Sequence, residues 1–104
     1  MKPHPLEHHR HRFHRQKVYV ECGPGWYTLL DYLLTGLSAD VQVMQIKEKF
    51  GTLRCYISGG TDDDYKLIEI AERESARTCE VCGAPGRLLG RGWFSTLCDR
   101  CRKN

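Results

Sequence analysis

The sequence predicts a small α+β domain in which a strand, a helix, two strands and a second helix precede a C-terminal four-cysteine module. Three observations predict this class: an apolar stripe at helical spacing in residues 26–37, two alternating segments at 41–48 and 52–58 joined by a short turn, and an acidic helix cap that begins at residue 61. With 104 residues, 40% of them hydrophobic, the chain supports one small core, which needs an additional stabilising cross-link such as a bound metal ion.

We expect residues 1–17 to form a flexible arm. This segment is rich in histidine and arginine and has no apolar periodicity, so it buries too little surface to offset its ordering entropy. It also lacks the apolar core of a secretory signal, and no segment is apolar enough to cross a bilayer, which predicts a cytoplasmic protein with reduced cysteines. Contact with an anionic partner and metal binding by the histidines are the other roles open to the arm.

The core, residues 18–78, is expected to begin with a strand at 17–21 and a helix from about residue 26 to residue 37. The strand segment is rich in residues that suit a pleated surface, and Pro24 is well placed near a first helical turn. Spacings of three and four then predict one buried helical stripe, formed by Trp26, Leu29, Leu30, Leu33 and Leu37.

Residues 41–48 and 52–58 are expected to pair as an antiparallel hairpin across Phe50 and Gly51. Side chains alternate between the two faces of a strand. The buried face should hold Met44, Ile46, Glu48, Phe50, Leu53, Cys55 and Ile57. The outward face should hold Val43, Gln45, Lys47, Lys49, Arg54 and Tyr56.

A second helix is expected from a cap at Thr61 to about Arg77. The side chains of Thr61 and of the aspartates at 62–64 can accept hydrogen bonds from free amides, and carboxylates favour the positive end of a helix. Three consecutive acids could also hold a metal ion, but at the start of a helix they more often act as caps.

Four cysteines in residues 79–104 have the spacing of a structural metal site. Cys79 and Cys82 form one pair, and Cys98 and Cys101 follow after fifteen residues. This pattern is typical of one structural zinc ion in a zinc ribbon or treble-clef-like module, whereas a redox-active pair needs a thioredoxin-like context. We expect the module to pack as one domain with the core. Trp93 and Phe94 should fill the small core of its hairpin, with base stacking as the alternative.

The sequence does not predict an enzyme. Four thiolates complete the coordination of zinc and leave no position for an activated water. All five histidines lie in the predicted arm, so the folded part has no histidine base. Cys22 and Cys55 are interpreted as small core or turn residues rather than nucleophiles.

Three motifs together form a recognisable combination: residues 21–27 (ECGPGWY), residues 45–54 (QIKEKFGTLR), and residues 79–86 (CEVCGAPG) with 96–99 (TLCD). Together they resemble a family of small uncharacterised proteins encoded by bacteriophages and prophages, over roughly residues 20–101. The resemblance implies no particular activity. It implies an accessory protein that acts in the cytoplasm of a bacterial host, where such proteins bind host enzymes, defence complexes or nucleic acid.

Charge is zoned along the chain. Residues 1–17 carry five basic and one acidic side chain. Residues 18–78 carry six basic and ten acidic side chains, and residues 79–104 carry five basic and two acidic ones. Within the acidic core, the outward face of the hairpin nevertheless gathers basic side chains and one aromatic ring. These are the expected partner-binding residues, Lys47, Lys49, Arg54 and Tyr56.

We therefore expect a zinc-stabilised protein that binds and modulates a host macromolecular complex, for example a defence or transcription assembly, through an acidic surface of that complex. The alternative is nucleic-acid binding by the two basic ends, which would neutralise phosphates. Its residues would be Arg10, Arg12, Arg15, Arg87, Arg91, Arg100 and Arg102. An enzyme of unknown type is the second alternative.

Overall fold

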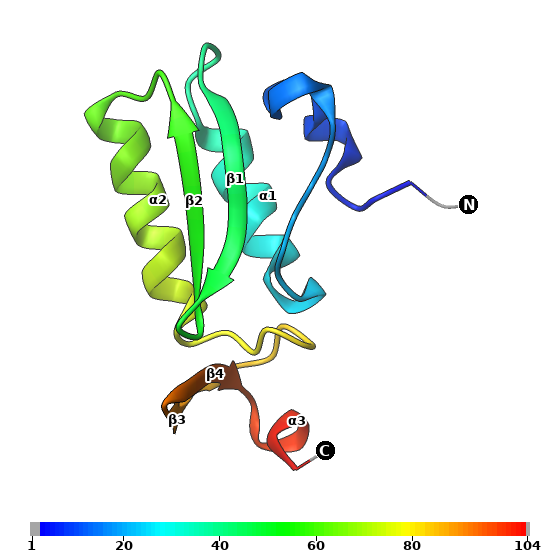
Figure 1. The fold of residues 1–104 in the computed structure, drawn as a ribbon, viewed down its shortest axis with the longest axis vertical. Helices are drawn as coiled ribbons and strands as arrows, with labels where there is room; N and C mark the ends of the chain where they lie inside the picture. Colours follow the sequence, from blue (N-terminus) through cyan, green and yellow to red (C-terminus); the bar gives the residue numbers. More distant parts are fainter. Residues whose placement is uncertain (1–2, 104) are drawn as a thin grey trace.

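Two helices cover one face of a β-hairpin, and the cysteine module lies at one end of this pair of layers (Figure 1). The computed structural model describes residues 3–103. Its elements are, in chain order, η1 (Glu7–Arg12), η2 (His14–Gln16), η3 (Pro24–Trp26), α1 (Tyr27–Gly36), β1 (Gln42–Lys49), β2 (Thr52–Ser58), α2 (Asp62–Ser75), β3 (Arg87–Arg91), β4 (Trp93–Leu97) and α3 (Asp99–Arg102). The predicted α+β class is confirmed.

The central hairpin has the predicted antiparallel pairing. Lys47 lies opposite Arg54, and Ile46 lies opposite Cys55. The turn between the strands places Phe50 at φ 54° and Gly51 at φ 85°, in the left-handed region that glycine enters without strain. The sequence therefore located both strands and the turn correctly.

A β-bulge at Met44 corrects the predicted alternation of side chains along β1. The register shifts between Val43 and Gln45, where one extra residue lies in the strand. Because of that insertion, both Val43 and Ile46 point into the core, while the Met44 side chain is 48% exposed. Strict alternation had placed Met44 inside and Val43 outside. Phe50, also expected inside, is exposed at the turn.

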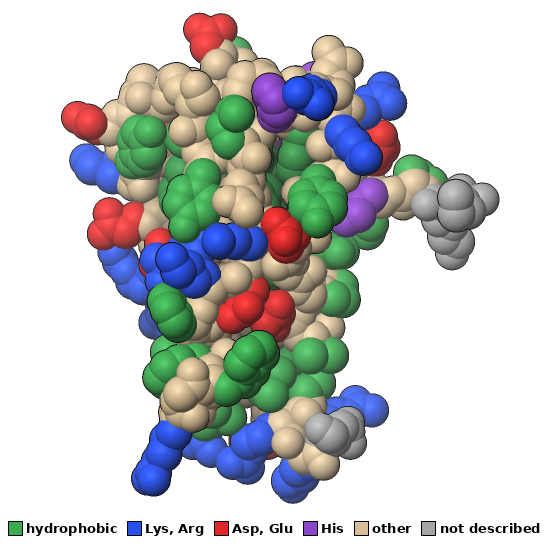
Figure 2. Space-filling view, in the orientation of Figure 1, with side chains coloured by type: hydrophobic (Ala, Val, Ile, Leu, Met, Phe, Trp, Pro, Cys, Tyr) green, Lys and Arg blue, Asp and Glu red, His purple; other side chains and the backbone are tan. Residues whose placement is uncertain are grey.

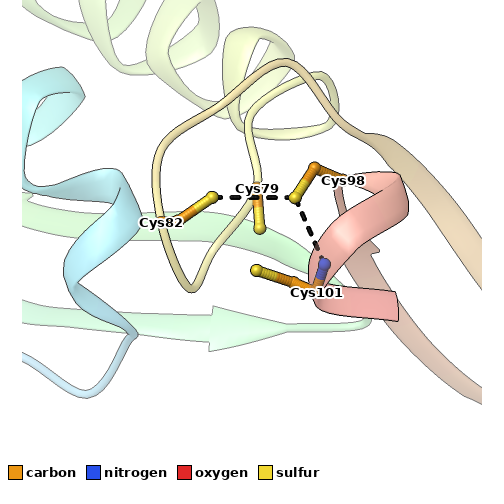
Figure 3. Close-up of side chains that lie close together, drawn as sticks. All are labelled: Cys79, Cys82, Cys98 and Cys101. Atoms are coloured by element: carbon orange, nitrogen blue, oxygen red, sulfur yellow. Dashed lines mark hydrogen bonds between the residues drawn. The ribbon is translucent and has the colours of Figure 1, made fainter. Parts of the chain in front are cut away.

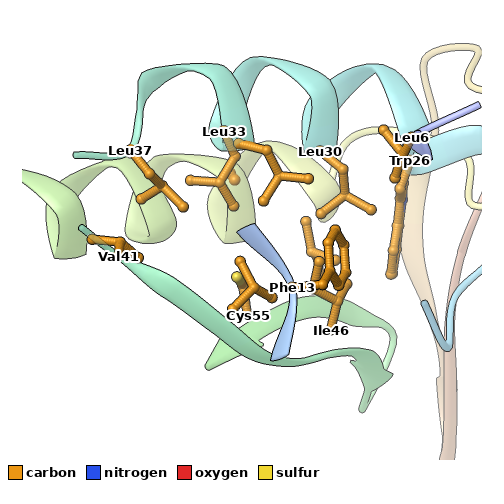
Figure 4. Packing of buried hydrophobic residues seen from close by; sticks show 13 residues of the cluster. Leu6, Phe13, Trp26, Leu30, Leu33, Leu37, Val41, Ile46 and Cys55 are labelled. Atoms are coloured by element: carbon orange, nitrogen blue, oxygen red, sulfur yellow. The ribbon is translucent and has the colours of Figure 1, made fainter. Parts of the chain in front are cut away.

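The apolar stripe of α1 is buried as predicted, and it packs against the hairpin (Figure 4). Leu30 and Leu33 are buried, and Leu29 is half-buried. Helix α2 lies beside α1 over the same face and adds Ala71 to the core. It begins as predicted, with a capping box between Thr61 and the residue three positions on, and ends two residues earlier than expected. Within the described residues, no α-helix covers the opposite face of the hairpin (Figures 1 and 4).

The predicted free arm is wrong for residues 3–17, which pack on the core. The side chains of Leu6 and Phe13 are 1% and 3% exposed and belong to the main apolar cluster (Figure 4). Arg12 is also buried, and its guanidinium donates to backbone carbonyls just after α1, those of Leu37, Ser38 and Val41. Two buried apolar side chains and one buried arginine hold the segment on the core. Because these residues follow no helical or strand periodicity, the sequence pattern did not reveal them. Residues 1–2 lie outside the described part of the chain.

The strand expected at 17–21 is reduced to a single bridge with β1. The Glu21 amide donates to the Ile46 carbonyl at 3.0 Å, and the Glu48 amide donates to the Glu21 carbonyl at 2.9 Å. Val18 and Val20 pack against the core from this side. The segment therefore runs alongside β1 without forming a third strand.

Replacing Phe13 with alanine tests the packing of the N-terminal segment. Loss of a buried phenylalanine should lower the free energy of unfolding by about 3–5 kcal/mol, measured by chemical denaturation. His14→Ala removes the neighbouring exposed side chain and should change stability by less than about 0.5 kcal/mol. Equal effects of the two substitutions would contradict the placement of Phe13 in the core.

Asp64 joins the start of α2 to the loop after α1. Its buried carboxylate accepts hydrogen bonds from the amide and hydroxyl of Thr61, at 2.9 and 3.0 Å, and from the amide and hydroxyl of Ser38, at 2.8 and 3.0 Å. The backbone donors of Thr61 and Ser38 favour the charged form most strongly and lower the pKa of Asp64 to about 2.

This lowered pKa predicts an acid-sensitive contribution to stability. The folded state holds the Asp64 proton more weakly than the unfolded chain, whose ordinary pKa is 3.8, so the contribution is complete above that pH and is lost as pH falls towards 2. Asp64→Asn should therefore be less stable than the wild type at neutral pH, and the two melting temperatures should converge below pH 3. Asp62→Asn, at an exposed position of the same helix turn, should follow the wild type at every pH.

Candidate metal centre

Four cysteine side chains converge beneath the β1–β2 turn (Figure 3), and they are Cys79, Cys82, Cys98 and Cys101. Their sulfur atoms lie within 4.8 Å of one another, and the Sγ atoms of Cys82 and Cys98 are 3.6 Å apart. A disulfide needs a separation of about 2.05 Å, whereas four thiolates at about 2.3 Å from one tetrahedral ion lie about 3.8 Å apart. The four cysteines therefore form a plausible metal site.

The first pair of sulfurs is positioned by a tight backbone turn. The Gly83 amide donates to the Cys79 carbonyl at 2.9 Å, and the Cys79 amide donates to the Ala84 carbonyl at 2.8 Å. Gly83 has φ 84°, which a residue with a side chain adopts only with strain. This turn brings the Cys82 side chain back towards Cys79.

The second pair of sulfurs lies at the start of a helix. Cys98 is the N-cap residue of α3, and the Cys101 amide donates to its sulfur at 3.4 Å. The antiparallel hairpin of β3 and β4 connects the first pair to this helix. A turn, a hairpin and a helix in this order match a treble clef better than a zinc ribbon.

The thiols of the cluster differ in their readiness to ionise. Burial opposes ionisation of Cys79, but backbone amides at Cys82, Cys98 and Val81 donate to its sulfur and together lower its pKa to about 6. Hydrogen bonds with Cys98 and Cys79 raise the pKa of Cys101 to about 12. Thiolate is the form that binds a metal, so an ion at the centre would displace the protons of the thiols.

The glycine-rich loop before α1 packs directly on the first cysteine turn. The Gly25 amide donates to the Glu80 carbonyl at 2.7 Å, and the Gly23 amide donates to the Glu80 carboxylate at 2.9 Å. A Cβ atom at Gly25 would lie 2.0 Å from the Cys79 carbonyl oxygen. The indole of Trp26, fully buried, donates to the Thr78 carbonyl at 2.8 Å. The sequence pattern did not predict that residues 23–26 pack on the cysteine turn, although the paired glycines indicated that two backbone segments could come close together there.

A second contact joins the cysteine module to the turn of the central hairpin. The buried Thr96 hydroxyl donates to the Gly51 carbonyl at 2.7 Å, and the Thr96 carbonyl accepts from the Glu80 amide at 3.0 Å. A Cβ atom at Gly51 would lie 2.5 Å from a methyl carbon of Leu88. Strand β4 is therefore held against both the β1–β2 turn and the cysteine turn.

The structure corrects the placement of two aromatic side chains in this module. Trp93 is 81% exposed and Phe94 is 36% exposed, so they do not fill a core beneath β3 and β4. Thr96 is the buried side chain of β4 instead. The hairpin has only five residues in each strand, and Thr96 and Leu88 lie against the β1–β2 turn, while Trp93 at its tip stays exposed.

The expected partner-binding residues share the uncovered face of the hairpin. Lys47 and Arg54 are directly opposed across the strands, Tyr56 is opposed to Gln45, and Lys49 lies near the turn. Arg54 also reaches Glu72 on α2, at 3.2 Å. The structure therefore brings these four side chains to one surface.

The arginines of the nucleic-acid alternative do not form one surface. Arg12 is buried against backbone carbonyls, and Arg10 and Arg15 lie on the N-terminal segment. The others surround the cysteine module, at the opposite end of the molecule in Figure 1, and are Arg87, Arg91, Arg100 and Arg102. The two basic ends of the sequence are thus separate in space.

The two remaining cysteines lie apart from the metal centre. Burial is the main cause that raises the pKa of Cys22 to about 12, and it alone raises the pKa of Cys55 to about 12. Both thiols are therefore protonated at neutral pH and poorly nucleophilic, which agrees with their interpretation as packing residues.

Comparisons with protein-family models, with curated proteins and with solved structures give no match. Within residues 3–103, no helix is long and apolar enough to span a membrane.

Cys82→Ser tests the metal centre. Removal of one of four thiolates should release the ion and lower stability by several kcal/mol, because binding to a structural site contributes directly to folding. Elemental analysis of protein purified without chelator, combined with thermal melting, measures both effects. Cys22→Ala serves as the matched control and should keep the full metal content. A wild-type chain without bound metal would overturn the assignment.

Proposed function

We propose that the chain is a zinc-stabilised binding protein, and that the uncovered face of its central hairpin binds an acidic surface of a protein complex. The observation that carries this proposal is a group of basic and aromatic side chains gathered on that face. Figure 2 shows Lys or Arg side chains beside hydrophobic ones over β1 and β2, with Asp or Glu side chains among them. We call this surface the hairpin patch, formed by Lys47, Lys49, Phe50, Arg54 and Tyr56.

The aromatic part of the patch continues onto the cysteine module. Phe50 is 63% exposed, and the Lys49 ammonium lies 5.6 Å from the centre of its ring. A hollow of about 290 Å³ lies between this turn and the tip of the β3–β4 hairpin, lined by Glu48, Phe50, Gly92, Trp93 and Phe94. Exposed tryptophan and phenylalanine side chains are enriched at protein interfaces, and a fixed hollow between them suits one apolar anchor of a partner.

Zinc is the ion that best suits the four-cysteine centre. Thiolates select soft or borderline ions, and four of them at tetrahedral spacing are typical of structural zinc. No coordination position remains for a reactive water, so the ion would act as a staple. This supports binding rather than catalysis at that centre.

The setting of this function follows from the sequence motifs. The ECGPGW, KEKFGTLR and CEVCGAPG runs resemble phage and prophage proteins, so we propose that the partner is a protein complex of a bacterial host, such as a defence or transcription assembly. The basic patch would then steer the protein to an acidic region of that complex.

Nucleic-acid binding is the second candidate, and one observation favours it. Trp93 is opposed to Arg91 at the tip of the β3–β4 hairpin and is almost fully exposed. An exposed indole beside a guanidinium can stack on a base while the arginine contacts a phosphate. The Glu48 carboxylate, which lines the same hollow as Trp93, weakens this candidate because it repels a phosphate backbone.

Charge reversal at two lysines tests the hairpin patch. The double variant Lys47→Glu, Lys49→Glu should keep its metal and its melting temperature, because exposed substitutions change stability by only about 0.5 kcal/mol. Its affinity for the partner captured from bacterial lysate should fall at least about tenfold, measured by calorimetry, because like charges would then face each other. Arg54 is left unchanged, since it is paired with Glu72.

A matched control reverses two charges elsewhere. Lys66→Glu with Arg73→Glu makes the same change in net charge on the exposed side of α2 and should bind normally, because the exposed Arg73–Glu69 ion pair that it removes contributes little to stability. If both double variants bind as well as the wild type, the hairpin patch is not the interface. Trp93→Ala, assayed with a single-stranded oligonucleotide at increasing salt, tests the second candidate in parallel.

A further inference from the structure

Two histidines of the N-terminal segment converge on one carboxylate of α1. The Nε2 atoms of His8 and His9 lie 2.9 Å and 2.7 Å from the same oxygen, Oδ1 of Asp31. The two rings are adjacent, with centroids 4.1 Å apart. The His9 side chain is only 8% exposed, whereas those of His8 and Asp31 are 61% and 51% exposed. Residues more than twenty positions apart thus present three ligand atoms to one point, all within 4.8 Å of one another.

We propose that His8, His9 and Asp31 form a second metal site, which binds a divalent ion such as Zn²⁺, Ni²⁺ or Co²⁺. Imidazole nitrogen and carboxylate oxygen suit this group of ions, whereas softer ions select the thiolates of the first site. The two sites use different elements of the fold and lie at different places on it. Occupation of one therefore requires no ligand from the other.

The distances of the cluster are close to those of a coordinated ion. With bonds of about 2.0–2.2 Å, two ligands of a tetrahedral ion lie about 3.4 Å apart, so each nitrogen–oxygen separation would lengthen by about 0.5–0.7 Å. The exposed side chains of His8 and Asp31 have room for this movement. His9 stays fixed by its burial and sets the place of the ion.

The carboxylate is already prepared for a cation. Hydrogen bonds from His9 and then from His8 lower the pKa of Asp31, so it is charged at neutral pH. Two neutral rings that each carry hydrogen on Nε2 satisfy this carboxylate without an ion. A metal bound at Nε2 instead requires the other neutral tautomer, in which each ring carries its single hydrogen on Nδ1.

An ion at this place would fasten the N-terminal segment to α1. His8 and His9 lie in η1, immediately before the buried Arg12 and Phe13, and Asp31 lies in the middle of α1. Three protein ligands leave at least one coordination position for water or for a group of a partner. The site is thus of the open kind, unlike the four-thiolate centre.

The experiment uses the untagged full-length chain with its four-cysteine site filled with zinc, titrated with Ni²⁺ by calorimetry. The wild type should bind one further equivalent and melt at a higher temperature in its presence. His8→Ala and Asp31→Asn, both at partly or fully exposed positions, should lower that affinity more than about tenfold, since loss of a supporting outer contact alone costs that much.

His11→Ala is the matched control, because it removes another exposed histidine of the same 3₁₀ helix and should leave Ni²⁺ binding unchanged. Circular dichroism checks that each variant is folded. The proposal is overturned if no further equivalent binds, or if one binds equally well to His8→Ala and Asp31→Asn. The three side chains would then serve only as a hydrogen-bonded contact.

Discussion

The close approach of the glycine loop to the first cysteine turn is the constraint on which the arrangement of the molecule depends. Gly25 lies so near the Cys79 carbonyl that no side chain fits between them. From this contact Trp26 extends into the core in one direction and donates to the Thr78 carbonyl in the other. The same few residues therefore begin α1, complete the apolar core and fix one half of the metal centre. Thr96 then fixes strand β4, and with it the second half, against the hairpin turn.

Sequence patterns predicted those elements whose structure is determined by residues close together in the chain. The stripe of α1, the capping box at Thr61, the β1–β2 turn and the four cysteines are all readable because each is specified within a few positions. Features fixed by distant contacts were missed. Leu6 and Phe13 have no periodicity and become core residues only because the space beside β1 accepts them. The bulge at Met44 also follows from the need to bury Val43 and Ile46 together, which no alternation indicates.

The folded N-terminal segment changes one argument about function. The absence of a histidine from the folded part was one reason to expect no enzyme, yet His9 is buried beside Asp31. The remaining reason is the closed sphere of four thiolates, which applies only to the cysteine centre. Binding is favoured because the strongest exposed feature is a basic and aromatic surface, and not because the chain lacks residues capable of catalysis.

That surface also depends on the metal centre. Both helices cover the same face of the hairpin, so the other face of a two-stranded sheet meets water, where polar side chains would suffice. It instead presents Phe50 next to Trp93, and these rings come from different modules. Their spacing is set by the Thr96 contact to Gly51 and by the Glu80 contact to Thr96, and both Thr96 and Glu80 lie in the segment between the four cysteines. An ion at the cysteines would therefore shape the proposed binding surface as well as stabilise the fold.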